Sequence, residues 1–445
     1  MRLEDGTVSA FASASFLSTI CEQLEVELVR DWSTGHDEYW GKVGHFSIGW
    51  KACNYVTGAL KKLLEANHER LGFDDETISQ GSEFRVGRKG FVPLADVPDY
   101  RWIGIDSRKN EPIQHFADID IVDIDGGPSM LHRCFDDPSQ ISATAWQKYF
   151  DGFKEKGVGP EEGALPFRVW QLWEEMVRYL KAGDVLRFIA AGGVLAHYVG
   201  DASQPLHCSW LHHGMPPTTK VDGRKYPLPR SSAEFEAFKK TRPAKIHSIY
   251  EEGMLEVDTA TALARVDEKI GHFHPDGRGI KSGHAAAVEI IRLMHDAQKR
   301  LSPRDIIKAD DPSLTEKERA RHLWANRTVR DATIQSLAES TMLLSDLWTS
   351  AWAAGGGAHI DKSKLIAFDE EDLMDVYRHS KFAESLSLAD MAESGRFEPQ
   401  DAAGVTRRIK KKVSRLVEAP VPARVVHQLS KKGGRRRAAR RSARD

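Results

Sequence analysis

The sequence predicts an all-α protein with a single helical core. Apolar side chains recur at three- and four-residue spacing over residues 167–180, 284–301 and 333–352, which is the repeat of one helix face. We find no sustained alternation of apolar and polar residues bounded by turn pairs, the pattern that predicts strands. We therefore expect a multi-helical domain in which loops present some of the functional side chains.

The expected elements follow one another in a simple order. An apolar helical run begins at Ile48 and continues to Leu64. Residues 67–145 are richer in Gly, Pro and Asp, which predicts loops with short elements. Residues 209–232 are rich in Pro and Lys and are expected to form an excursion beside a cleft, and Ala-Gly-Gly-Gly-Ala at 354–358 predicts the domain's end. The predicted divisions are an N-terminal extension (1–39), a helical domain (40–355), a helical appendage (356–405) and a basic, disordered tail (406–445).

The composition is that of an ordinary globular protein. Hydrophobic residues make up 41% of the chain, and the mean hydropathy is −0.45. No run approaches the roughly 18 apolar residues that a membrane helix needs. The modestly apolar stretch 7–20 follows Glu4 and Asp5, which do not resemble the basic start of a signal peptide. The four cysteines are widely spread and predict no disulfide framework, and the compartment stays open.

The C-terminal tail differs in charge from the rest of the chain. Residues 406–445 hold 15 Lys and Arg against 2 Asp and Glu, a net charge of +13, whereas the whole chain carries −2. Such a segment is too charged to fold alone. It is expected either to contact anionic lipid or nucleic acid or to be a solubilising tail with no fixed partner. No obligate protein partner is indicated.

The most informative motif is His197-Tyr-Val-Gly-Asp201-Ala-Ser-Gln-Pro-Leu-His207. Asp184 can cap a helix that Pro205 should end. Residues four apart lie on the same face of a helix, so His197 and Asp201 could grip one cation. Imidazole and carboxylate are ligands of zinc. The alternative is an ordinary His–Asp hydrogen bond at a helix end.

Four other places supply more ligands of the same kind. They are Trp40-Gly-Lys-Val-Gly-His45, Val97-Pro-Asp99-Tyr-Arg101, Gln114-His115-Phe-Ala-Asp118 and Lys245-Ile-His247-Ser-Ile-Tyr-Glu251. Taken singly, His45 could be a helix-start residue, and His247 with Glu251 an exposed helical ion pair. Taken together, these residues are enough to bind two or three metal ions.

The order of these motifs resembles the zinc-dependent phospholipase C and single-strand nuclease superfamily. The resemblance covers residues 40–255, with helical pattern continuing to about 353. It implies an all-helical domain with two or three Zn²⁺ ions in a cleft. The implied ligands are Asp99, His115, His197 and Asp201 for the first ion, His207, His247 and Glu251 for the second, and His45, Asp201 and Trp40 for a third.

Trp40 departs from the family pattern, in which the third ion uses an N-terminal tryptophan. Here Trp40 is internal and its nitrogen is an amide, a poor zinc donor. Three explanations are open: the first 39 residues are removed, the third ion is held differently, or it is absent. Exported location is common in the family, but no clear signal peptide supports it here.

The resemblance also implies a mechanism, in which a zinc-bound hydroxide attacks phosphorus. Beside the metal-bound Asp99, Asp118 is expected either to orient or deprotonate the attacking water or to hold a ligand histidine in its tautomer. Arg101 is expected to clamp the phosphate.

The substrate class is less sharply indicated. Glu251 and Pro98-Asp99-Tyr100 resemble the phospholipases, and the Trp-Gly-x-x-Gly-His spacing resembles the nucleases. We therefore predict a phospholipase C-like hydrolase of phosphate esters, with phospholipid as substrate. The alternatives are a single-strand-type nuclease or 3′-nucleotidase acting on single-stranded nucleic acid, and a non-catalytic, zinc-containing polyanion-binding protein.

Overall fold

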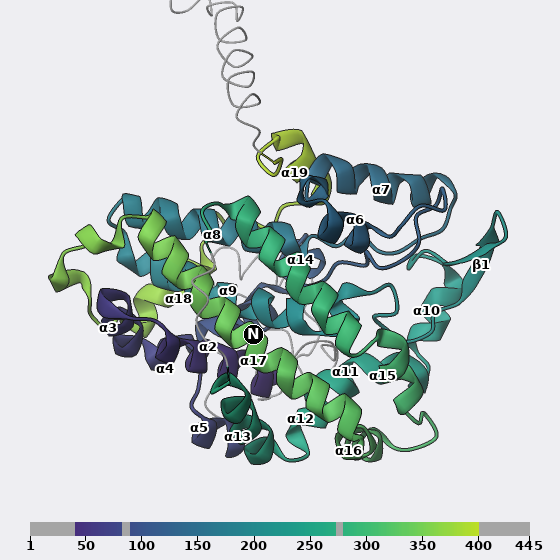
Figure 1. Ribbon diagram of the computed structural model, residues 1–445, viewed down its shortest axis with the longest axis horizontal. Helices are drawn as coiled ribbons and strands as arrows, with labels where there is room; N and C mark the ends of the chain where they lie inside the picture. Colours follow the sequence, from purple (N-terminus) through teal and green to yellow (C-terminus); the bar gives the residue numbers. More distant parts are fainter. Residues whose placement is uncertain (1–40, 82–89, 273–278, 400–445) are drawn as a thin grey trace, which may run out of the picture. The chain divides into compact units, whose positions relative to one another are not determined.

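The computed structural model describes residues 41–81, 90–272 and 279–399. The described residues up to Glu398 belong to one compact unit, drawn in colour in Figure 1. Apart from one short hairpin, the regular elements of these residues are helices. The prediction of an all-α, single-core domain is therefore confirmed. The expected N-terminal extension (1–39) and the basic tail (406–445) lie outside the described residues.

The helices range from single turns to the 28 residues of α17. In the first half they are α2 (Gly41–Ala52), α3 (Gly58–Ala66), α4 (His68–Leu71), α5 (Asp75–Ser79), α6 (Met130–Asp136), α7 (Ala143–Glu155), α8 (Leu165–Lys181) and α9 (Val185–Ser203). In the second half they are α10 (Ala233–Lys239), α11 (Ile246–Ser248), α12 (Met254–Glu256), α13 (Thr259–Ile270), α14 (Gly283–Arg300), α15 (Pro303–Ala309), α16 (Glu316–Ala325), α17 (Arg327–Ala354), α18 (Glu370–Arg378) and α19 (Leu388–Ser394).

Helix α9 lies at the centre of the unit, and 17 of its 19 residues are buried. It packs against α2, α8, α14, α17 and α18, and Figure 1 shows the long α17 crossing in front of it with α14 alongside. The carboxylate of Asp184 accepts a hydrogen bond from the backbone N–H of Arg187, as the cap prediction required. The helix ends at Ser203, just before Pro205.

The predicted periodic stretches coincide with helices α8, α14 and α17, apart from Leu301, which follows the last residue of α14. The run from Ile48 to Leu64 was expected as one helix, and this was wrong. It breaks between α2 and α3, where Val56 and Thr57 are extended and Gly58 has a φ of 64°. Thr and Gly are weak helix formers, so the chain turns at this point despite its apolar pattern.

The excursion at 209–232 contains the hairpin that the sequence prediction missed. Strands β1 (Thr218–Val221) and β2 (Arg224–Pro227) pair antiparallel around Asp222 and Gly223, whose φ angles are 50° and 81°. Positive φ at both central residues is the geometry that an Asp-Gly hairpin turn adopts. The signal was present, but the strands are too short to show an alternating pattern.

The expected boundary near residue 355 is a turn inside the compact unit, which continues to Glu398. Gly356 takes a left-handed φ of 80°, which redirects the chain after α17. The segment beyond it buries Leu373, Tyr377, Leu388 and Phe397 completely. Residues 356–398 are thus part of the core rather than an appendage, because the three glycines allow close packing and a reversal of direction.

No helix within the described ranges combines the length and the apolar character that a membrane crossing requires.

Gly193 on α9 provides a test of how closely this core is packed. A Cβ atom at Gly193 would lie 2.3 Å from Cβ of Leu94. We expect Gly193→Ala to lower the free energy of unfolding by about 1–3 kcal/mol, because overpacking forces neighbours to shift. Urea unfolding measures the change. Gly279→Ala is the control, since nothing lies within 4 Å of a Cβ there, and equal stability of the two variants would contradict the packing described.

Candidate metal centre

The predicted ligands converge from segments far apart in the sequence. His45 comes from α2, His197 and Asp201 from α9, and His207 from the short turn Pro205–Cys208. Asp99 and Glu251 both lie in single π-helical turns, Pro98–Trp102 and Ile249–Gly253. Such turns are rare and are frequent at functional sites. His115 follows the turn Pro112–Gln114, and His247 lies in α11.

The first ligand set consists of Asp99, His115, His197 and Asp201. From Nε2 of His197 it is 3.0 Å to Nδ1 of His115, 3.3 Å to Oδ1 of Asp99 and 3.5 Å to Oδ2 of Asp201. Nδ1 of His115 lies 3.5 Å from the same Asp99 oxygen and 3.2 Å from the same Asp201 oxygen.

These distances can be compared with a tetrahedral zinc site. Bonds of about 2.0–2.1 Å place neighbouring ligands about 3.3 Å apart, since the edge of a tetrahedron is about 1.63 times the centre-to-corner distance. The five measured edges of the first set lie on either side of that value. These five edges agree with tetrahedral separations. The ligand groups divide at Asp99, however: His115, His197 and Asp201 form one group, and Asp99 belongs to another with His45, Asp96 and His197.

The second set consists of His207, His247 and Glu251. Oε2 of Glu251 lies 2.8 Å from Nε2 of His247 and 3.4 Å from Nε2 of His207. All three side chains are almost fully buried, which contradicts the alternative of an exposed helical ion pair at His247 and Glu251. Three protein donors leave one tetrahedral position for another ligand, which is the arrangement of catalytic zinc sites.

Asp201 joins the first set to a third group formed with His45 and Glu251. Its Oδ2 faces the first set, whereas Oδ1 lies 3.6 Å from Nε2 of His45. The His45 ring stacks on His197 with 3.8 Å between centroids, and it lies inside α2 rather than at its start. Trp40, the remaining implied ligand of a third ion, lies outside the described residues.

Backbone carbonyls fix which nitrogen of two histidines faces the centre. Nδ1 of His197 lies 3.0 Å from the carbonyl oxygen of Ala95, and Nδ1 of His207 lies 2.6 Å from that of His115. A carbonyl oxygen only accepts, so Nδ1 donates in both cases and Nε2 is left to bind a metal. In neutral rings the lone pair of Nε2 of His197 then points toward Nδ1 of His115, an arrangement that a cation between them stabilises.

Burial dominates the electrostatics of the centre. It lowers the pKa of His45, His115, His207 and His247, so these rings are neutral and able to bind a metal. Burial also raises the pKa of the carboxyls, to about 7 for Asp99 and well above the usual range for Asp201 and Glu251.

His197 is the exception among the histidines. Burial acts to lower its pKa, but Asp99 and Asp201 outweigh burial and raise the pKa well above the usual value. Neither oxygen of Asp201 accepts a hydrogen bond from a described residue. Buried carboxylates without donors are costly. A buried carboxylate without a donor attracts positive charge, which either protons or a metal ion can supply.

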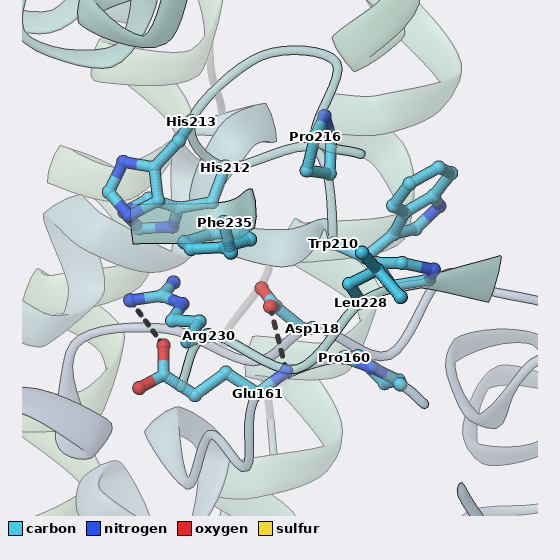
Figure 2. A pocket seen from close by; sticks show the side chains of 12 residues that line it. Asp118, Pro160, Glu161, Trp210, His212, His213, Pro216, Leu228, Arg230 and Phe235 are labelled. Carbon is cyan, nitrogen blue, oxygen red and sulfur yellow. Dashed lines mark hydrogen bonds and ion pairs between the residues drawn. The ribbon is translucent and has the colours of Figure 1, made fainter. Parts of the chain in front are cut away.

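Asp118 lies in a pocket beside the second set and belongs to none of the metal-ligand groups of the described residues. Figure 2 shows it with Arg230, His212 and Phe235 around the same space. Its Oδ2 accepts a hydrogen bond of 3.2 Å from the backbone N–H of Glu161, and burial raises its pKa well above the usual range. The His212 ring, 4.1 Å from that of His247, separates this pocket from the second set. The role of Asp118 toward water stays a prediction.

Arg101 has a structural partner. Its Nη2 donates a 2.6 Å hydrogen bond to the carbonyl oxygen of Gly90. The role of phosphate clamp stays a prediction, and it would require Arg101 to leave this contact or to use its remaining N–H groups.

Sequence reasoning missed four residues around the centre. Asp96 lies 3.4 Å from Nδ1 of His197, and Glu111 lies 3.7 Å from Nε2 of His115. His212 and His213 line the pocket beside the second set. A signal existed for Glu111, which precedes His115 by four residues, the spacing of the two predicted His–carboxylate pairs. His212 and His213 lie just beyond His207 in the sequence, but their position in the pocket depends on how the chain folds back after His207, which the spacing does not predict.

No family model matches the chain. It is similar to a probable serine protease of Bradyrhizobium tropiciagri, with 33% identity over 428 residues. The alignment covers 86% of this chain and 53% of that protein. The chain thus spans about half the length of the curated relative it matches.

The first and second sets use different donor residues, so substitutions in each set should change the zinc content separately. We expect His247→Ala to lose one zinc ion per chain, because it removes a donor of the second set alone. Adding Asp201→Asn should remove the remaining zinc, since Asp201 serves the first set and faces the third. Elemental analysis after dialysis measures zinc per chain. Exposed His359→Ala is the control, and wild-type metal content in the double variant would refute the assignment.

Proposed function

We propose that this chain is a zinc-dependent hydrolase of phosphate esters, of the phospholipase C type. The observation that carries the proposal is that two buried three-donor groups lie side by side: His115 with His197 and Asp201, and His207 with His247 and Glu251. When bound, zinc lowers the pKa of water to about 7 and offsets negative charge on a phosphoester. The chain's own contribution is to orient the ligand nitrogens through backbone carbonyls and to keep the centre dry.

The non-catalytic alternative predicts ligand sets that are fully closed by protein. The first set does not agree with it, because Asp99 does not join the group of His115, His197 and Asp201. The second set does not either, because His207, His247 and Glu251 supply only three donors, and the His212 ring next to it lines the pocket with Asp118. A position left open next to a pocket supports an enzyme over a structural zinc protein.

The alternative of a nuclease or 3′-nucleotidase is favoured by Arg230. Its guanidinium carbon lies 5.2 Å from the ring centre of Phe116 and 5.9 Å from that of Phe235. Aromatic faces of this kind would otherwise suit the quaternary ammonium of a choline head group. Arg230 occupies these faces and is itself paired with the Glu161 carboxylate (Figure 2). The faces are therefore not open to choline, and phosphodiesters without choline belong among the substrates to be tested.

The name of the similar bacterial protein supports hydrolytic activity in general. That name applies to a protein of which this chain matches about half, so it does not assign protease activity to the matched half. Ser129 and His132 do form a serine–histidine contact of 2.7 Å, but the Ser129 hydroxyl also caps α6. A peptide substrate should therefore be assayed beside lipid and DNA, and protease activity is not proposed.

The substrate class can be decided by one comparative assay. We expect the zinc-loaded protein to hydrolyse phosphatidylcholine vesicles, and expect a chelator to abolish the activity. Single-stranded DNA and a casein substrate are assayed in parallel. Activity on DNA alone would replace the phospholipase proposal with the nuclease alternative. Activity on casein alone that survives the chelator would refute both.

His197 provides the sharpest single-residue test. His197→Ala removes a donor from the middle of the first set, and we expect turnover to fall by at least about 1,000-fold while the helical circular dichroism is retained. The control is His132→Ala, which changes an exposed histidine. Wild-type turnover in the folded His197→Ala protein would exclude the first set from catalysis.

A further inference from the structure

A buried polar network surrounds Glu111, next to the first ligand set. Glu111, Arg168 and Tyr198 are all fully buried. Nη2 of Arg168 lies 3.2 Å from Oε2 of Glu111, and the hydroxyls of Tyr198 and Ser385 each donate a short hydrogen bond to the same carboxylate. Two hydroxyl donors and a paired cation hold this carboxylate in one orientation.

The network reaches the metal centre through His115. Oε1 of Glu111 lies 3.7 Å from Nε2 of His115, whose Nδ1 faces the first set. The distance exceeds that of a direct hydrogen bond, yet the carboxylate still favours a proton on Nε2. A proton there leaves Nδ1 free to bind a metal, which is how carboxylates commonly orient ligand histidines.

The network also reaches the segment that follows α18. Nη1 of Arg168 donates to the carbonyl oxygens of Ala383 (2.9 Å) and Glu384 (3.1 Å). Arg108 donates to those of Phe382 (2.8 Å) and Ala383 (3.0 Å). Backbone carbonyls from one late segment thus accept hydrogen bonds from two buried guanidinium groups.

We propose that Glu111 is a positioning residue that orients the ring of His115. Residues 382–386 in turn hold the Glu111 carboxylate and Arg168 in place, so that this late segment of the compact unit affects the zinc affinity. This inference rests on the proposed zinc centre. It gives residues 382–386 a role at a site whose ligands all lie before residue 252. Ser385 is the direct link, because its side chain contacts the Glu111 carboxylate.

The test is zinc affinity, measured on the full chain by competition with a chromophoric chelator. Glu111→Gln keeps the size of the side chain and removes its charge, and we expect the dissociation constant of the tightest zinc ion to rise about 10- to 100-fold. Ser385→Ala should give a smaller rise without leaving Arg168 unpaired. Glu339→Gln is the matched control, since Glu339 pairs with Arg300 at 2.5 Å and with Gln335, away from the ligand sets.

The outcomes separate this inference from the proposed function. A rise for Glu111→Gln and Ser385→Ala, with no change for Glu339→Gln, supports positioning even if no phosphoester is hydrolysed. Wild-type affinity in folded Glu111→Gln would overturn the inference and leave the hydrolase proposal intact. If Glu111→Gln does not fold, wild-type affinity in Ser385→Ala overturns the coupling to residues 382–386.

Discussion

The constraint on which the structure depends is the burial of three carboxylates among imidazoles at one point of a helical core. Asp99, Asp201 and Glu251 reach this point from a π-helical turn, the central helix and a second π-helical turn. Carboxylates in such surroundings are unstable unless positive charge or donors compensate them. Within the described residues Asp201 has no hydrogen-bond donor at all. The fold therefore maintains a cluster that needs compensating positive charge, which either protons or metal ions can supply.

The central helix shows how the core accommodates this cluster. Glycine weakens a helix, by about 1 kcal/mol relative to alanine, yet α9 contains Gly192, Gly193 and Gly200. At Gly200 a Cβ atom would lie 3.0 Å from Nδ1 of His45. The glycine thus allows the ring of His45 to stack on His197 beside the ligand-bearing face. Close approach of neighbouring segments outweighs helix propensity here, because packing supplies most of a buried helix's stability.

Contacts between residues close together in the sequence could be predicted from helical spacing, whereas contacts between distant segments could not. The His197–Asp201 and His247–Glu251 pairs were predictable because helical geometry alone brings residues four apart together. Convergence of these pairs with Asp99 and His115 followed from the order of motifs in a family resemblance, not from periodicity. Glu111 was missed although it has the same spacing to His115, since it precedes the histidine and resembles an ordinary acidic loop residue. The turn at Gly356 was mistaken for a boundary, because glycines mark both linkers and tight reversals.

The two main ligand sets differ in how their donor atoms are grouped. In the first set, His115, His197 and Asp201 form one three-donor group, whereas Asp99 belongs to another group with His45, Asp96 and His197. The second supplies three, and its neighbour His212 lines the pocket that holds Asp118 and Arg230. Asp201 links the first set to the third group, because its two oxygens face different partners. Under the proposed zinc function, the position that the protein leaves open in the second set lies next to His212, and the shared carboxylate of Asp201 couples the groups on either side of it.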